Sequence, residues 1–153
     1  MRILFQLLVL SLLAIHSSSQ NFKKENPLAH TFSIVARDEQ TGEMAVAVQS
    51  HWFSVGTIVS WGEAGVGVIA TQSFVNVSFG TKGLDLLRRG LTAAETLDIL
   101  LKADEGREVR QVAIIDTNGN VATHTGKMCI QYASHIQGKQ FSVQANMMLG
   151  NEV

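Results

Sequence analysis

Two neighbouring runs, 31–37 and 43–51, are rich in apolar and β-branched residues, and a short polar segment at 39–42 separates them. Such runs predict β-strands, and the short connection predicts that they pair as a hairpin. Alternate positions of the second run form two sets, Ala45, Ala47 and Gln49 on one side and Met44, Val46, Val48 and Ser50 on the other. Because both sets are largely apolar, we expect both faces of this sheet to be covered.

Further along the chain, the spacing at which apolar residues recur changes from that of a strand to that of a helix and then back to that of a strand. The pattern predicts strands at 57–61 and 65–73, helices at 78–90 and 92–104, and strands at 111–117, 120–125 and 141–148. Strands, then helices, then strands again indicate an α+β layered fold in place of alternating βαβ units.

Two short motifs mark boundaries within this pattern. Thr92 and Glu95 have the spacing of a capping box at a helix start. Asn118-Gly119 is typical of a two-residue hairpin turn, which would pair Ala113 with His124.

The two ends of the chain bear on where the protein goes and how its sheet is covered. Residues 1–19 join a basic start to a short apolar stretch and small polar residues, which is typical of a cleaved secretory signal peptide, and 20–30 form a polar spacer. We therefore expect an exported protein, periplasmic or extracellular, with one domain over 31–153.

Strands apolar on both faces need a second covering layer, and no segment before Val153 supplies it. We expect C-terminal truncation in preference to a covering partner.

Composition narrows the classes of partner. The 153 residues are 46% hydrophobic and carry a formal net charge of −1, which suits one globular domain and gives no sign of a nucleic-acid or anionic-membrane partner. No stable membrane anchor is expected, and a homo-oligomer stays open. A single cysteine, Cys129, allows no intramolecular disulfide, and we expect it to be a half-buried strand residue in preference to a nucleophile.

Several familiar catalytic motifs fail on context or spacing. Gly65–Ala70 matches the dinucleotide pattern G-x-G-x-x-A, but its residues continue a strand and open no helix, so we expect no nucleotide cofactor. No G-x-S-x-G elbow is present. The histidines lack metal-ligand spacing, so no metal is expected, and His51 and His124 are candidates for lining a pocket or for structural hydrogen bonds.

Thr31 is the residue with the most specific chemical potential. It stands at the head of the first predicted strand, shortly after the leader. A cut between His30 and Thr31 would give it a free α-amine with a reference pKa of about 7.7–8.0, a base beside its own hydroxyl near neutral pH. If the signal peptidase cuts near Gln20 and nothing else is cut, Thr31 stays internal and inert. Spacing alone favours that second reading.

Several separate blocks of the chain resemble one known family. They are Thr31–Asp38, Ala47–Phe53, Glu63–Gly67, Gln111–Asp116, His124–Gly126 and Phe141–Met147. The family is the bacterial domain of unknown function 1028, placed in the N-terminal-nucleophile (Ntn) hydrolase superfamily, and the resemblance runs from Thr31 to Val153. It implies a four-layer αββα sandwich whose last helical layer lies beyond Val153.

The same resemblance implies a catalytic role for Thr31. This chain lacks a counterpart for the helper lysine of proteasome-like members, because Gln49, Ser50 and Glu63 stand in the relevant strands. Acylase-like members use the amine and an oxyanion hole, to which Gln144 and Asn146 could donate.

Two functional hypotheses follow. The first is an exported Ntn-type hydrolase of a small amide or peptide, with Thr31 as nucleophile and base and a pocket lined by Ser33, Ser50, His51, His124, Gln144 and Asn146. The second is a non-catalytic periplasmic binding or assembly module on the same fold. Superfamily membership favours the enzyme. A metal hydrolase using His51 and His124 is a third reading without a local ligand motif.

Overall fold

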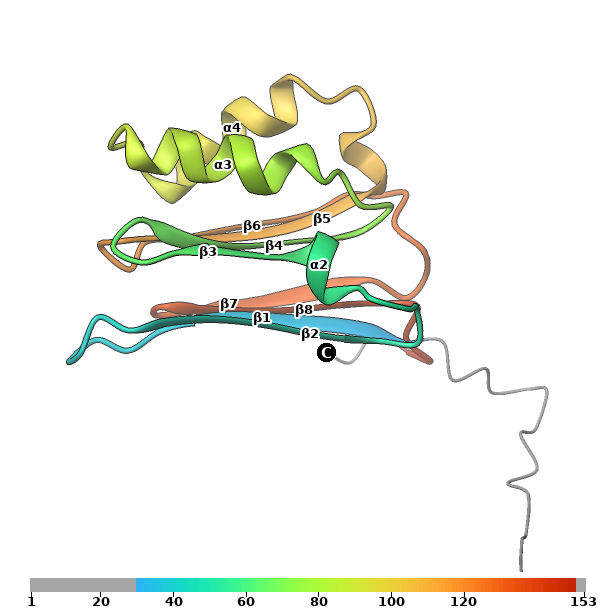
Figure 1. Ribbon diagram of the computed structural model, residues 1–153. Helices are drawn as coiled ribbons and strands as arrows, with labels where there is room; N and C mark the ends of the chain where they lie inside the picture. The colour runs from blue at the N-terminus through green and yellow to red at the C-terminus, as the bar shows by residue number, and fades with distance from the viewer. Residues whose placement is uncertain (1–29, 151–153) are drawn as a thin grey trace, which may run out of the picture.

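The computed structural model describes residues 30–150 as two stacked antiparallel sheets with helices over one of them (Figure 1). Sheet A has the order β2-β1-β8-β7 and is built from β1 (Thr31–Arg37), β2 (Met44–Ser50), β7 (Ser134–Gly138) and β8 (Phe141–Asn146). Sheet B has the order β3-β4-β5-β6 and is built from β3 (Ser60–Glu63), β4 (Gly67–Ser73), β5 (Arg110–Asp116) and β6 (Val121–Thr125). The helical elements are α2 (Gly56–Val59), α3 (Ser78–Arg88), α4 (Ala93–Lys102) and the 3₁₀ turn η1 (Arg107–Val109). The α+β class is confirmed.

Strand alternation builds the core between the sheets. In β1, Val35 is fully buried and points inward, and it packs in a cluster with Val68 of β4 and Ile115 of β5. The inward residues of β2 are half-buried. Ala45, Ala47 and Gln49 share the opposite face, as their alternation predicts, and are exposed there. This inner face carries the polar residues described below.

A second core lies between sheet B and the helices. Ile69 and Ile114 of the sheet pack against leucines of α3 and α4. Close approach requires glycine in α3, because a Cβ on Gly83 would lie 2.4 Å from Ile69 Cδ1. The capping box is confirmed: Thr92 accepts a hydrogen bond from the Glu95 amide, and the Glu95 carboxylate accepts from the Thr92 amide.

Within residues 30–150, no helical layer lies over the outer face of sheet A (Figure 1), which agrees with the expectation that these residues do not supply the layer that would cover it. Apolar side chains are exposed there: Phe32, Ile34, Ile136 and Phe141. In the register of the strands, Ala47, Ile34, Val143 and Ile136 form one row across all four strands.

The β5–β6 hairpin differs from its prediction by one residue. His124 pairs with Val112, not with Ala113, so it lies on the face of sheet B that the helices cover. The turn is longer because Asp116 holds it: its Oδ1 accepts from the amides of Asn118 and Asn120 at 2.9 and 3.0 Å. Gly119, with φ of +82°, closes this three-residue loop.

Two further expectations are corrected, and one strand is added to those expected. Residues 57–59 form part of α2, where Val59 packs into the inter-sheet core, and are not the start of a strand. The strand β7 lacks an alternating apolar signal and was not predicted. Cys129 is buried in the loop after β6 and not in a strand, and its thiol donates to the Arg110 carbonyl.

The signal peptide and most of the spacer, residues 1–29, lie outside the described residues, so those predictions stay predictions. Within residues 30–150, no helix is long and apolar enough to cross a membrane.

Candidate functional site

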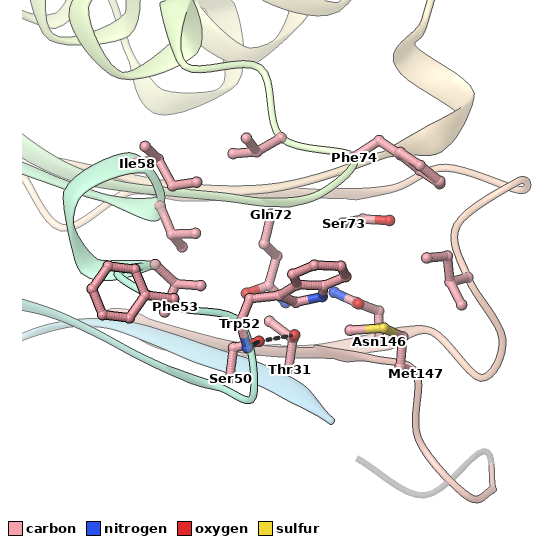
Figure 2. A pocket seen from close by; sticks show the side chains of 14 residues that line it. Thr31, Ser50, Trp52, Phe53, Ile58, Gln72, Ser73, Phe74, Asn146 and Met147 are labelled. Carbon is pink, nitrogen blue, oxygen red and sulfur yellow. Dashed lines mark hydrogen bonds between the residues drawn. The ribbon is translucent and has the colours of Figure 1, made fainter. Parts of the chain in front are cut away.

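A cavity of about 390 Å³ opens at the end of the sandwich where β1 begins and where β2, β4 and β8 end (Figure 2). Its polar residues are Thr31, Ser50, Gln72, Ser73 and Asn146. Its apolar residues are Trp52, Phe53, Val55, Ile58, Val59, Phe74, Val75, Ile130 and Met147. Both sheets and α2 therefore contribute to one concave site, the usual form of a ligand pocket.

Thr31 reaches the cavity because of its place in β1. Its side chain alternates inward with Ser33 and Val35, and only 5% of the residue is exposed. The register places it directly between Ser50 of β2 and Asn146 of β8. The Thr31 and Ser50 hydroxyl oxygens are 2.7 Å apart and hydrogen-bonded, and Ser50 Oγ also accepts from the Trp52 amide (Figure 2).

Behind Thr31, buried side-chain amides connect the two sheets. Gln111 Oε1 of sheet B accepts from Gln72 Nε2 at 2.7 Å and from Asn146 Nδ2 at 3.1 Å. Gln111 Nε2 lies 3.0 Å from Thr125 Oγ1 and from the carbonyl oxygens of Ser134 and Ala145. Such a network fixes side-chain positions, because each buried group depends on its partners.

The network leaves buried acceptors unused on both sheets. Asn146 Oδ1, Gln72 Oε1 and Gln144 Oε1 are buried without a hydrogen-bond partner among the described residues. Unsatisfied buried acceptors are uncommon in native proteins and call for a donor from a ligand, a water molecule or a changed chain end.

The backbone around the cavity is also unusual. Ser73 and Met147, which line it, have φ of +68° and +58°, and Ser54, between two lining residues, has φ of +57°. Residues other than glycine rarely adopt this left-handed backbone conformation, and those that do are concentrated at functional sites.

The structure brings three of the predicted site residues together at the cavity: Thr31, Ser50 and Asn146. Ser33 and Gln144 lie deeper on the same inner face, where Gln144 Nε2 donates to Ser33 Oγ at 2.9 Å. His51 is exposed after the end of β2, where its ring centroid lies 5.0 Å from that of Trp52 at an interplanar angle of 46°, and it does not line the cavity.

His124 lies outside the site as well. Its Nε2 is 2.9 Å from the Arg107 carbonyl oxygen, on the helix side of sheet B. His51 follows β2 of sheet A, whereas His124 is in β6 of sheet B. The structure therefore does not bring together the two histidines that a metal hydrolase would need. Among residues 30–150, no three His, Cys, Asp or Glu side chains gather as a metal site would require.

Burial also raises the pKa of the Cys129 thiol, which makes it a poor nucleophile.

Sequence reasoning missed Trp52, Gln72 and Gln111 as members or supports of the site. A signal did exist for the two glutamines, because each is an amide side chain next to an otherwise apolar strand run. Nothing local shows that they are register partners or that they face Asn146.

The comparisons with known proteins identify a family and no activity. The family model "Family of unknown function (DUF1028)" matches residues 31–153. The crystal structure of protein SPO2555 from Silicibacter pomeroyi, also assigned to DUF1028, is similar, with 29% sequence identity and a TM-score of 0.76. That match covers 80% of this chain and 55% of the SPO2555 chain, so this chain spans little more than half the length of that relative. No curated protein matches the chain.

Proposed function

This chain belongs to the DUF1028 family of unknown function, and we propose that it is an amide hydrolase whose nucleophile is the Thr31 hydroxyl. The observation that carries the proposal is the position of Thr31, at the head of β1 and on the wall of a cavity. Its hydroxyl is hydrogen-bonded to Ser50, and Asn146 lies across the strand pair.

The proposal requires that the His30–Thr31 peptide bond be hydrolysed. His30 contacts the rim of the cavity, because its Nδ1 is 2.9 Å from the carbonyl oxygen of the lining residue Met147. Removal of His30 would open the polar end and give Thr31 an α-ammonium group with three donors. The unpaired Asn146 Oδ1 belongs to the register partner of Thr31 and is a natural acceptor for it.

The reaction would then run in two balanced halves. The α-amine takes the proton of the Thr31 hydroxyl as its oxygen bonds to the substrate carbonyl carbon, and the carbon–nitrogen bond breaks as that proton passes to the leaving amine. Water then attacks the resulting ester, which releases a carboxylic acid and restores the hydroxyl. Asn146 Nδ2 gives one hydrogen to Gln111, and its second hydrogen could stabilise the oxyanion.

The test is to sequence the N-terminus of the exported protein and to assay it on a panel of small amides. We expect a mature chain that begins at Thr31, with Thr31→Ala lowering activity by at least about 10³-fold and Thr31→Ser keeping a measurable rate. Thr41→Ala, in the exposed β1–β2 turn, is the matched control and should leave the rate unchanged. A mature chain that begins near Gln20, with no dependence on Thr31, would overturn the proposal.

The alternative is a non-catalytic binding or assembly module on the same fold. What favours it is that Thr31 is internal in this sequence and only 5% exposed. An uncut mature chain that binds a ligand in the cavity without turning it over would support this alternative.

Export and the fourth layer belong to the same proposal. The signal-peptide pattern of residues 1–19 supports a periplasmic or extracellular location. A helical layer over the outer face of sheet A, as the Ntn resemblance implies, is supported by the exposed apolar side chains there. SPO2555 has a chain long enough to supply such a layer, since only 55% of it is matched.

A further inference from the structure

We infer that the cavity beside Thr31 selects an uncharged, apolar acyl group, so that the substrate is the amide of a medium-chain or aryl carboxylic acid. This inference rests on the proposed function in one respect, because the ligand is a substrate only if the protein is a hydrolase. The selection itself is a binding property of the cavity and can be measured without turnover.

Charge is the first argument. Among the described residues, no side chain that lines the cavity is charged, and nine of the fourteen lining residues are apolar. A carboxylate or ammonium at the far end of the acyl group, along the apolar walls and away from the α-amine of Thr31, would lose its hydration and gain no counter-ion, which is strongly unfavourable. The cavity therefore rejects charged acyl groups.

Exposed aromatic groups are the second argument. Trp52, Phe53 and Phe74 line the cavity and are 65%, 98% and 53% exposed. Large exposed aromatic side chains that converge on one concave site are typical of a ligand-binding surface, because a bound apolar group would remove them from water. Trp52 and Thr31 line the same cavity, so an occupant would be in reach of both the aromatic rim and the hydroxyl (Figure 2).

The distribution of polar atoms orients the ligand. Thr31 and Ser50 carry the hydroxyl groups at the sheet A wall, whereas Ile58 and Val59 of α2 and Phe74 form apolar walls (Figure 2). A carbonyl group would lie near the hydroxyls with its hydrocarbon part along the apolar walls. In this inference the hydrocarbon part along those walls is the acyl side of the amide.

Volume sets the size of that group. An engineered cavity of about 150 Å³ accommodates benzene, so the 390 Å³ found here would hold roughly a dozen non-hydrogen atoms. Acyl chains of up to about eight carbons, or a phenyl group on a short linker, fit this limit.

Binding is tested on the full exported chain with Thr31→Ala, which prevents turnover of the probes. The neutral probes are butanamide, hexanamide and octanamide. The charged probes are adipamate, in which a carboxylate replaces the terminal methyl of hexanamide, and 6-aminohexanamide, in which an ammonium group is attached to that terminal carbon. The chain has two tryptophans, so the indole N–H signal of Trp52 in an NMR titration is a simple reporter. We expect affinity to rise about fourfold per added methylene. Both charged probes should bind at least tenfold more weakly than hexanamide.

A matched pair of variants locates the binding. Ile58→Asn, on the cavity wall, should weaken hexanamide binding at least fivefold. Ile99→Asn, on α4 and similarly exposed (43% against 36%), should leave it unchanged. The probe series on the Thr31→Ala chain stands even where Ile58→Asn fails to fold. Affinity that is flat with chain length, or a charged probe that binds as well as hexanamide, overturns the inference.

The two proposals fail separately. Chain-length-dependent binding by a protein that hydrolyses none of these amides would sink the proposed function and leave the apolar site standing. Hydrolysis that depends on Thr31 but prefers charged acyl groups would overturn the apolar site and leave the hydrolase standing.

Discussion

Gln111 is the residue through which the two sheets share hydrogen bonds behind the candidate nucleophile. It is fully buried, and its side-chain oxygen accepts from Gln72 and Asn146. Its side-chain nitrogen lies within hydrogen-bond distance of Thr125 and of two carbonyl oxygens of sheet A. The position of Asn146 beside Thr31 therefore depends on a residue that does not itself line the cavity.

Gln111→Leu keeps the volume and removes every one of these bonds. It leaves the buried Nδ2 of Asn146 without its acceptor and Gln72 with only the longer bond to the Gln144 carbonyl. We expect a loss of about 3 kcal/mol in the free energy of unfolding, measured by urea titration. Gln40→Leu, in the exposed β1–β2 turn, is the control and should change stability by less than about 0.5 kcal/mol. Equal losses in the two variants would contradict the bridging role of Gln111.

Asp104 gives the molecule a residue-scale pH dependence. Hydrogen bonding from Arg110, whose Nε donates to Asp104 Oδ2 at 2.8 Å, holds the carboxyl pKa below its usual value. A carboxyl with a lowered folded pKa stabilises the fold above the unfolded pKa, near 3.9. That stabilisation is lost as pH falls below about 4 and is gone once pH passes the lowered folded pKa.

Asp104→Asn should therefore be less stable than the unmodified chain at pH 7, and the gap between them should close under acid conditions. Urea titrations at pH 7, 5, 4 and 3 measure it. Asp98→Asn removes an exposed carboxylate paired with Lys102 and should give a much smaller gap at every pH. A gap of constant size from pH 7 to pH 3 would show that the Asp104–Arg110 pair is not its origin.

At the scale of elements, local signals predicted what local contacts decide. The capping box of α4 was predicted correctly because both of its partners lie within four consecutive residues. The β5–β6 register was not, because the turn is set by Asp116, whose buried carboxylate accepts from the amides of Asn118 in the loop and Asn120 after it. Its Oδ2 also accepts from the amide of Ala93, the first residue of α4, 23 positions away. A dipeptide rule contains none of that information.

Asp116→Ala should loosen the hairpin and the start of α4 together. Three backbone amides lose their acceptor, so we expect a loss of about 2–4 kcal/mol in the free energy of unfolding. Hydrogen exchange should rise at the amides of Ala93, Asn118 and Asn120. Thr117→Ala changes an exposed side chain in the same turn and is the control. Faster exchange confined to the hairpin, with Ala93 unaffected, would contradict the coupling of the two elements.

At the scale of the whole molecule, the order of strands and helices predicted a layered α+β fold, and the alternation within β2 predicted which of its side chains share a face. It could not predict that β1 pairs with β8, since Thr31 meets Asn146 across more than 100 residues of intervening chain. The cavity depends on that pairing. Thr31, Ser50 and Asn146 could therefore be named as site candidates in advance, whereas Gln72 and Gln111, which contribute from sheet B, could not.

The outer face of sheet A supplies the prediction at this scale. Ile34, Val143 and Ile136 are adjacent across β1, β8 and β7, and the two isoleucines are 39% and 51% exposed. A continuous apolar row of this kind binds hydrophobic dyes and promotes association. The double change Ile34→Thr with Ile136→Thr keeps β-branched residues, so it should lower dye fluorescence of the 153-residue chain by about half or more, with a change in unfolding free energy below about 1 kcal/mol.

Ile99→Thr, a comparably exposed isoleucine on α4, separates this face from general surface hydrophobicity and should leave the dye signal unchanged. The stability measurement matters as much as the fluorescence. Side chains as exposed as these, whose packing is limited to neighbours on the same sheet face, cost little to replace, whereas a loss of several kcal/mol would mean that another segment or a second copy already covers the face. An unchanged dye signal in the double variant, with full stability, would remove the outer face of sheet A as an exposed binding surface.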